Sequence, residues 1–380
     1  MRAGSDCTCF IRMSPDESLI KAVILRRPRQ LELIEIPRPR LTEENHVLVQ
    51  VRACGICGSD LRYFLGENPW ALHTLGRHVD NPPDMILGHE LAGVVVEVNS
   101  PRHAHLLGRR VGVQAFRTCG ACRLCLSGHE NLCRRTLHIG HAQGWGAMDY
   151  YPGGYAEYCL AWADLLHPMA DHVAFEEEAM RDILGVAVHA VGRAEIPADA
   201  SVLSIGGGPA GLSIAQVARA RGAAHALISD PSPLAREIIG RHAGLTAFDP
   251  RCASLDDGVR RITGQTQCHA IFDTVGSVET FHAALHLLAP AGAYVNLAVQ
   301  NLDATLNLAA LGSERRVTAS SNAFYADERE AHRLIETRGV DLRSMITHRF
   351  PLESYAEAFD LLARAAREAY KVVFEIGDLT

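Results

Sequence analysis

Four closely spaced cysteines could together hold one metal ion. Cys119, Cys122, Cys125 and Cys133 lie within the stretch TCGACRLCLSGHENLC. Thiolates at such spacing can surround a single tetrahedral ion, and soft sulfur ligands select zinc. A loop of this length cannot bury a core of its own, so the ion would serve to fold it. The spacing therefore predicts a structural zinc site.

A second group has the residue types of an open, catalytic zinc site. Cys57 and Ser59 lie in ACGICGSD, and His89 and Glu90 lie in LGHE. These motifs offer the thiolate, imidazole and carboxylate groups that a catalytic zinc site requires. We therefore expect two zinc ions per chain, one structural and one catalytic.

A glycine-rich loop has the form of a dinucleotide-binding turn. SIGGGPAGLS follows the apolar run SVLSI and opens a helical stretch, and its motif residues are Gly206, Gly208, Pro209, Ala210 and Gly211. Glycines there allow a tight turn close to a pyrophosphate, which a helix N-terminus stabilises. Asp230 stands about twenty residues on, where a carboxylate binds the ribose hydroxyls of NAD and repels the 2′-phosphate of NADP. The alternatives are a glycine turn without a ligand, and an aspartate that only caps the next helix.

The sequence changes character along its length, which predicts two domains. Short β-rich runs from Lys21 to about Ala170 indicate an all-β, barrel-like domain. From Ser201 short apolar strands alternate with helical stretches, which is typical of an α/β parallel sheet with crossover helices. After about Leu311 the order changes again, and we expect the last strands, MITHRF and YKVVFEI, to rejoin the first domain.

Composition excludes several classes of protein. The 380 residues include 37 Lys and Arg, 44 Asp and Glu, and a formal net charge of -7, which argues against nucleic-acid or anionic-membrane partners. The chain has neither a run of about 18 apolar residues nor the apolar stretch of a secretory signal. We therefore predict a cytoplasmic protein with no membrane partner, in which grouped cysteines bind metal rather than form disulfides.

Taken together, these motifs resemble the zinc-containing medium-chain alcohol and polyol dehydrogenase family. The resemblance runs from about Lys21 to Ile376 and rests on CGICGSD, GHE, the four-cysteine lobe, PGGYAEY, IGGGPAGL with Asp230, and ITHRFPLESYAEAF. It implies a GroES-like β-rich catalytic domain and a Rossmann domain with a doubly wound parallel sheet. We place a disordered leader at 1–18, the catalytic domain at 19–170 completed by 311–380, and the NAD-binding domain at 171–310.

The resemblance also implies roles for individual residues. In the family, the residues equivalent to Cys57 and His89 bind the catalytic zinc, the equivalent of Asp60 orients the histidine, and the equivalent of Ser59 receives the alcohol proton. The third ligand departs from the polyol pattern, because this chain has Asp182 where polyol dehydrogenases have glutamate. The Asp-Ile-Leu setting resembles the formaldehyde dehydrogenase branch, in which an aspartate binds the metal. Glu90 remains the alternative ligand.

The function that this resemblance implies is NAD-dependent oxidation of a secondary or polyhydroxylated alcohol, such as a polyol, a cyclitol or a sugar-derived alcohol. We expect the substrate cleft to be bordered by the long segment GENPWALHTLGRHVDNPPD, with Trp70, His73, Arg77 and His78, and by Tyr63, Phe64 and the tract HIGHAQGWGAMDYYPGG. Arg62 stands where many relatives have a relay histidine, and it would contact substrate or pair with a surface acid.

Two other functions remain open at this point. One is an NAD-retaining aldehyde dehydrogenase or dismutase of the formaldehyde dehydrogenase branch, and the other is a catalytically silent protein that binds NAD and zinc. The small-molecule partner would be an alcohol or carbonyl compound. The family also implies a homodimer or homotetramer built by sheet extension through the region NLAVQNLDATLNL.

Overall fold

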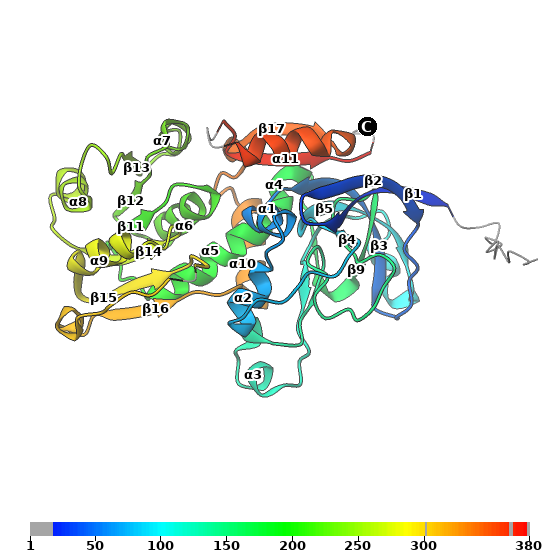
Figure 1. Ribbon diagram of the computed structural model, residues 1–380, viewed down its shortest axis with the longest axis horizontal. Coiled ribbons are helices and arrows are strands. Elements are labelled where there is room, and N and C mark those ends of the chain that lie inside the picture. Colours follow the sequence, from blue (N-terminus) through cyan, green and yellow to red (C-terminus); the bar gives the residue numbers. More distant parts are fainter. Residues whose placement is uncertain (1–17, 301, 365–367, 378–380) are drawn as a thin grey trace, which may run out of the picture.

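The fold comes from a computed structural model, which describes residues 18–300, 302–364 and 368–377. The leader predicted at residues 1–18 lies outside the described residues, except for Ser18. Two lobes lie side by side, one β-rich and one built on a single parallel sheet flanked by helices (Figure 1). No helix of the described ranges is long and apolar enough to cross a membrane. The cytoplasmic location stays a prediction.

The β-rich lobe has two main sheets, in agreement with the predicted all-β domain. One has the strand order β2-β1-β4, and the other has the order β10-β6-β5-β3-β18-β17 with β9 paired to β3. The early strands coincide with the apolar runs of the sequence: β1 (Leu19–Arg27), β2 (Gln30–Pro37), β3 (His46–Gly55), β4 (Met85–Ile86), β5 (Glu90–Val98), β6 (Arg110–Val113), β9 (Tyr158–Trp162) and β10 (Leu166–Pro168). Their inward side chains form one core with Trp162, Tyr155 and Phe374.

The second lobe is a six-stranded sheet with the order β13-β12-β11-β14-β15-β16 in which all pairs are parallel. Its strands are β11 (Ser201–Ile205), β12 (His225–Ser229), β13 (Leu245–Phe248), β14 (Cys268–Asp273), β15 (Leu288–Asn296) and β16 (Arg316–Ala319). Numbered along the chain, this is the order 3-2-1-4-5-6 of the doubly wound Rossmann fold, which confirms the predicted fold class. Because β16 belongs to this sheet, the sheet extends past residue 310, where we placed the end of the domain.

Helices cover both faces of the parallel sheet (Figure 1). One face packs against apolar side chains of α5 (Arg181–Ala194), α6 (Pro209–Ala220), α7 (Pro233–Gly240) and α10 (Tyr325–Glu336). The opposite face packs against α8 (Leu255–Thr263) and α9 (Val278–His286). Burial on both faces explains why the sequences of the central strands are continuously apolar and do not alternate between apolar and polar residues.

The chain returns to the β-rich lobe at its end, as the sequence predicted. The strands β17 (Ile346–Pro351) and β18 (Lys371–Glu375) are parallel to each other, and β18 pairs antiparallel with β3. Between them α11 (Tyr355–Ala363) packs on the core through Phe359. This return places Lys371 beside residues that are more than 280 positions away in the sequence.

Short elements lie in the region that contains the predicted site residues. They are α1 (Gly58–Phe64), α2 (Pro69–Leu75), β7 (Phe116–Arg117), α3 (Arg123–Leu126), β8 (Leu137–His138) and α4 (Phe175–Ala179). The small segment that carries α3, which we call the cysteine lobe, protrudes from the body of the molecule (Figure 1). It contains the four closely spaced cysteines.

Candidate active site

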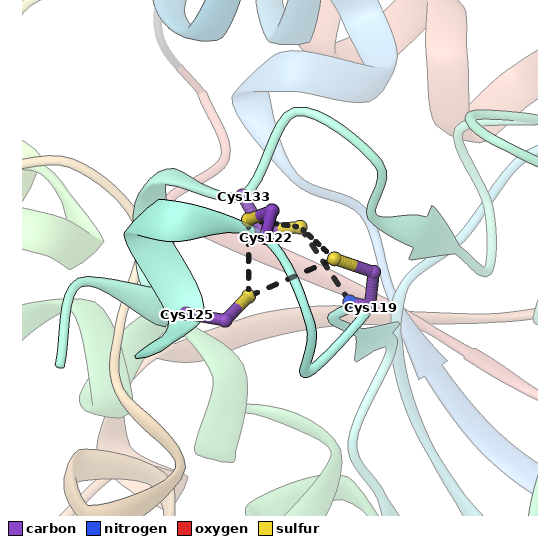
Figure 2. A group of neighbouring side chains, drawn as sticks. All are labelled: Cys119, Cys122, Cys125 and Cys133. Atoms are coloured by element: carbon purple, nitrogen blue, oxygen red, sulfur yellow. Dashed lines mark hydrogen bonds between the residues drawn. The ribbon is translucent and has the colours of Figure 1, made fainter. Parts of the chain in front are cut away.

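The four cysteines of the protruding lobe converge on one point (Figure 2). The Sγ–Sγ distances are 3.5 Å for Cys122–Cys125 and Cys119–Cys133, 3.9 Å for Cys119–Cys125 and 4.0 Å for Cys122–Cys133. A tetrahedral zinc with bonds of about 2.3 Å requires sulfur atoms roughly 3.8 Å apart. The geometry therefore fits a four-thiolate zinc site.

The surroundings of the lobe favour thiolate over thiol at one of these ligands. The backbone N–H of Ala121 is the main group that lowers the pKa of Cys119, to about 6. The guanidinium of Arg135 also lies 3.2 Å from the Cys119 sulfur and stabilises its negative charge. Zinc binds the deprotonated form of cysteine, so these contacts favour metal binding.

Cys57, His89 and Asp60 meet at the junction of α1 with the β-rich lobe. Cys57 precedes the first turn of α1, and its backbone N–H donates to Asp60 Oδ2 at 2.9 Å. The same oxygen accepts the hydroxyl of Tyr155 at 2.8 Å, while Asp60 Oδ1 lies 3.5 Å from His89 Nδ1. Burial would raise the pKa of Asp60, but the charge of His89 and these hydrogen bonds hold it below its usual value. Asp60 thus lies against Nδ1 of His89, and the other ring nitrogen, Nε2, faces away from it.

Glu90 and Asp182 are the two carboxylates that could supply a further ligand. Single ligand atoms of Cys57, His89 and Glu90 lie within 4.8 Å of one another. However, Glu90 is fully buried and its Oε2 forms a close ion pair with Lys371 Nζ. Asp182 Oδ2 lies 3.9 Å from His89 Nε2, the nitrogen that faces away from Asp60. We regard Asp182 as the better candidate, because its carboxylate is not bound to a buried cation.

Cys57, His89 and Asp182 line a cleft with a volume of about 260 Å³, whereas Glu90 does not. Its polar lining includes Ser59, whose Oγ is buried and has no hydrogen-bond partner among the described residues. Residues from both lobes contribute, since Leu297 and Val299 follow the carboxyl end of β15. In doubly wound sheets, ligands bind beyond the carboxyl ends of the strands. The cleft therefore brings the predicted metal ligands to the side of the sheet where a cofactor would lie.

Some residues expected at the cleft line it and others do not. Trp70 and His73, on α2, line the cleft, as do His138 and His141 from the HIGHAQGWGAMDYYPGG tract. Arg77 and His78 of the same long segment are exposed and are not among the lining residues. The expectation was wrong for Tyr63 and Phe64, whose rings pack in the β-rich core because they lie on the inner face of α1.

His138 and His141 form a stack of rings against His89. The ring centroids of His138 and His141 are 4.0 Å apart, and those of His141 and His89 are 4.4 Å apart. Burial, with the nearby charge of His89, lowers the pKa of His138 to about 4. These two rings therefore remain neutral near pH 7 and form a polar, uncharged wall of the cleft.

Sequence reasoning missed several residues that the cysteine lobe brings to the cleft. Thr118, Glu130, Asn131 and Thr136 lie between or beside the four cysteines, and all line the cleft. Asn322, which precedes α10, lines the cleft from the side of the parallel-sheet lobe. For the residues of the cysteine lobe the only available signal was position, because each lies between or beside the four grouped cysteines.

The glycine loop has the shape that a dinucleotide requires. Gly206 has a φ of 95°, in the region that favours glycine, and a Cβ on Gly211 would lie 1.9 Å from the carbonyl oxygen of Gly206. A Cβ on Gly208 would meet no atom within 4 Å, so space is open above the loop. Pro209 begins α6, with Ala210 in its first turn, so free N–H groups face this space. The loop fits a pyrophosphate group.

Asp230 follows β12 beside this loop and is buried. Its Oδ2 accepts the N–H of Gly207 at 2.7 Å, and its Oδ1 accepts the N–H of Ser232 at 2.7 Å. The carboxylate thus helps to shape the turn before α7 (Pro233–Gly240), although the N-cap of this helix is Ser232 and not Asp230. The position is also that of a ribose-binding carboxylate at the end of the second strand of a Rossmann sheet.

Arg62 pairs with a nearby acid and a backbone carbonyl. Its Nε donates to Glu67 Oε2 at 2.6 Å, and its Nη1 donates to the carbonyl of Val299 at 3.1 Å. Of the two roles expected for Arg62, the structure shows the pairing with a surface acid.

Comparison with known proteins gives matches over both lobes. Residues 43–171 match the family model of the alcohol dehydrogenase GroES-like domain, and residues 209–337 match that of zinc-binding dehydrogenases. D-xylulose reductase A from Aspergillus oryzae is 28% identical over 341 residues, which cover 88% of this chain and 91% of that protein.

Two solved structures illustrate the range of ligands among similar proteins. Galactitol-1-phosphate dehydrogenase from Escherichia coli superposes with a TM-score of 0.78 at 25% identity, covering 93% of this chain and 99% of that one. A Sinorhizobium meliloti protein described as a zinc-binding dehydrogenase was solved with NADP bound, and it superposes with a TM-score of 0.82 at 26% identity, covering 94% and 100%.

Proposed function

Because the chain belongs to the zinc-containing medium-chain alcohol and polyol dehydrogenase family, we propose that it transfers a hydride from a secondary or polyhydroxylated alcohol to NAD. The observation that carries the proposal is the convergence of Cys57, His89 and Asp182 on one cleft beside the carboxyl end of the parallel sheet. The chain is an oxidoreductase of a family that uses zinc and a nicotinamide cofactor. The substrate class and the choice of NAD are the proposed part.

Cys57, His89 and Asp182 would hold the catalytic ion, with Asp60 fixing the ring of His89. Glu90 would remain bound to Lys371 beside them. A bound zinc would act as a Lewis acid that lowers the pKa of the substrate hydroxyl, and NAD would accept the hydride. The four-cysteine lobe would hold a second, structural zinc.

Ser59 is the group that we assign to accept the proton of the substrate hydroxyl. Its Oγ is buried at the cleft and has no other hydrogen-bond partner among the described residues, so its lone pairs are available. Arg62 cannot continue the relay, because a guanidinium stays protonated and this one is bound to Glu67. We therefore propose that the proton leaves from Ser59 through the cofactor ribose and water.

Asp230 supports NAD over NADP. The carboxylate lies beside the glycine loop, where its charge repels a 2′-phosphate. Among similar structures NADP also occurs, so the preference is a property of this loop rather than of the fold.

A homo-oligomer built by sheet extension is the assembly that we propose. β16 is the edge strand of the parallel sheet, and Val317 on it is 40% exposed. Leu302 and Leu308, in the preceding segment, are 59% and 75% exposed. An exposed edge strand with apolar side chains beside it favours pairing with a second copy. Whether a dimer or a tetramer forms is a question for sedimentation in solution.

The test is NADH formation from NAD across polyols, cyclitols, simple alcohols and aldehydes, with NADP in parallel and zinc quantified on the same preparation. We expect turnover of a polyhydroxylated alcohol by protein that holds two zinc ions per chain. NAD that stays bound through purification, together with aldehyde consumption, would instead identify the dismutating branch. Absence of turnover at full zinc occupancy would favour the hypothesis of a catalytically silent protein that binds NAD and zinc.

A further inference from the structure

One buried oxygen of the cleft has no hydrogen-bond donor. Asn131, in the 3-10 turn Glu130–Leu132 of the cysteine lobe, is 8% exposed and lines the cleft. Its amide nitrogen Nδ2 donates to the carbonyl of Ser321 at 2.9 Å and lies 3.3 Å from His189 Nε2. Its carbonyl oxygen Oδ1 has no hydrogen-bond partner in the part of the chain that the structure describes.

The orientation of this amide follows from its neighbours. Asp327 Oδ2 lies 2.8 Å from His189 Nδ1, and since a carboxylate only accepts, Nδ1 carries the proton. Nε2 of the neutral ring then accepts from Asn131. Rotating the amide by 180° would place Oδ1 against the Ser321 carbonyl and against bare Nε2, where three acceptors would meet. Nδ2 therefore faces these groups, and Oδ1 is the atom of the amide that has no partner among the described residues.

The supporting residues are themselves fixed. Asp327 also accepts the N–H of Phe324 at 2.9 Å, which caps α10 (Tyr325–Glu336), and the Phe324 ring packs edge-on to His189 with centroids 4.6 Å apart. His189 is buried on α5 (Arg181–Ala194). The chain Asp327–His189–Asn131 thus joins two helices to the cysteine lobe and ends in a free acceptor.

The charges around the cleft restrict what can bind there. The acidic lining residues are Glu130, the candidate zinc ligand Asp182, and Glu328, which is ion-paired with the buried Arg181. No lysine or arginine is among the lining residues in the part of the chain that the structure describes. Phosphate and carboxylate groups are recognised by such cations, most often arginine. Apart from the proposed zinc, the lining offers no cation, so it suits a ligand that binds through hydroxyl groups rather than through a phosphate ester.

We propose that Asn131 is a specificity residue that accepts a hydrogen bond from a hydroxyl of an uncharged polyol, and that His189 and Asp327 are its positioning residues. The inference rests on the proposed dehydrogenase function and narrows its substrate class. It separates this chain from a similar protein named for galactitol 1-phosphate, whose substrate is anionic.

The first test compares galactitol and xylitol with galactitol 1-phosphate as substrates of the full-length enzyme. We expect kcat/KM for at least one uncharged polyol to exceed that for the phosphate ester by tenfold or more. A preference for the phosphate ester would overturn the substrate class while leaving the dehydrogenase function intact. Absence of turnover with every alcohol would overturn the proposed function itself.

The second test uses Asn131→Ala. One neutral hydrogen bond corresponds to roughly a 3- to 10-fold change in affinity, so KM for the preferred polyol should rise by about that factor. The kcat should change little, because the contact is equally present in the ground and transition states. Asn99→Ala is the matched control, since Asn99 also donates to one backbone carbonyl but is exposed and outside the cleft. An unchanged KM in Asn131→Ala would overturn the assignment.

The positioning role is tested by His189→Phe, alone and combined with Asn131→Ala. Phenylalanine fills the space but offers no acceptor, so KM should rise in the single variant, and the double variant should resemble Asn131→Ala. Zinc content and the urea unfolding midpoint of each variant separate loss of positioning from loss of folding. Fully additive effects on KM would show that His189 does not act through Asn131.

Discussion

Lys371 on the last strand, β18, forms a buried ion pair with Glu90, the residue that follows the candidate zinc ligand His89. Lys371 is 3% exposed and Glu90 fully buried, and the Lys371 ammonium also donates to the Ile56 carbonyl at 3.1 Å. Burial would lower the pKa of Lys371, but the charge of Glu90 raises it. The pair neutralises a second carboxylate beside the metal site and links that site to the end of the chain.

The ion pair between Lys371 and Glu90 leads us to expect that removing one charge lowers the free energy of unfolding more than removing both. Lys371→Met leaves the buried Glu90 carboxylate without a cation, and breaking such a pair costs about 3–5 kcal/mol. The double variant Lys371→Met with Glu90→Gln removes both charges and should recover most of this loss. Urea unfolding of the two single variants and the double variant measures the coupling. Equal loss in Lys371→Met and in the double variant would contradict the role of the pair.

Asp182→Ala should lower the zinc content from two ions to about one per chain. The reason is that Asp182 faces Nε2 of His89, whereas Glu90 is held by Lys371. Metal analysis after gel filtration gives the count, with Glu90→Gln as the matched carboxylate control. If Asp182→Ala retained both ions and Glu90→Gln lost one, Glu90 would be the ligand.

Asp230→Gly should raise the use of NADP relative to NAD. Removing the carboxylate removes its repulsion of the 2′-phosphate and its hydrogen bonds to the ribose. The ratio of kcat/KM for the two cofactors is the measurement. The variant also loses the contacts of Asp230 with Gly207 and Ser232, so some loss of stability is expected alongside the change. A cofactor ratio equal to that of the parent would rule out this role of Asp230.

We expect the free energy of unfolding to decrease in mild acid because of His167 on β10. Burial, together with the charge of Arg181, lowers its pKa to about 2 in the folded chain. The unfolded chain binds the proton near pH 6.5, so the contribution of neutral His167 is complete above that pH and decreases as pH falls below it. At pH 5.5 the loss amounts to roughly 1.4 kcal/mol.

His167→Gln should remove that part of the pH dependence, as measured by urea unfolding at pH 8.0 and pH 5.5. The neighbouring His332 acts in the opposite sense: burial would lower its pKa, but its contact with Glu178 raises it, so its contribution is present below pH 6.5 and lost above. His105→Gln, at an exposed position, is the control. The interpretation fails if His167→Gln and His105→Gln show the same pH dependence as the parent.

Local patterns in the sequence predicted the fold well, and the motif residues Cys57 and His89 line one cleft in the structure. The apolar runs coincide with strands of both lobes because burial on one or both faces of a sheet leaves a direct trace in composition. The cysteine spacing and the glycine loop are equally local patterns. In each case a short, continuous segment contains all the residues of the motif. These features required no knowledge of which distant segments meet.

Contacts between distant segments could not be predicted in the same way. Lys371 and Glu90 meet only because β18 pairs with β3, and the sequence contains no pattern for that pairing. The side chains of Asn131 and His189 likewise meet across the two lobes. The edge strand β16, with its mixed polar and apolar residues, is too short to be recognised as part of the parallel sheet.

The most direct test of the proposed hydride transfer uses xylitol deuterated at its carbinol carbons, with NAD and fully zinc-loaded protein. Mass spectrometry of the reduced cofactor should show one deuterium per molecule, because the hydride comes from the carbinol carbon of the substrate. Reduced cofactor that contains no deuterium would contradict the account. Absence of reduced cofactor with xylitol and with every other uncharged polyol tested would also contradict it.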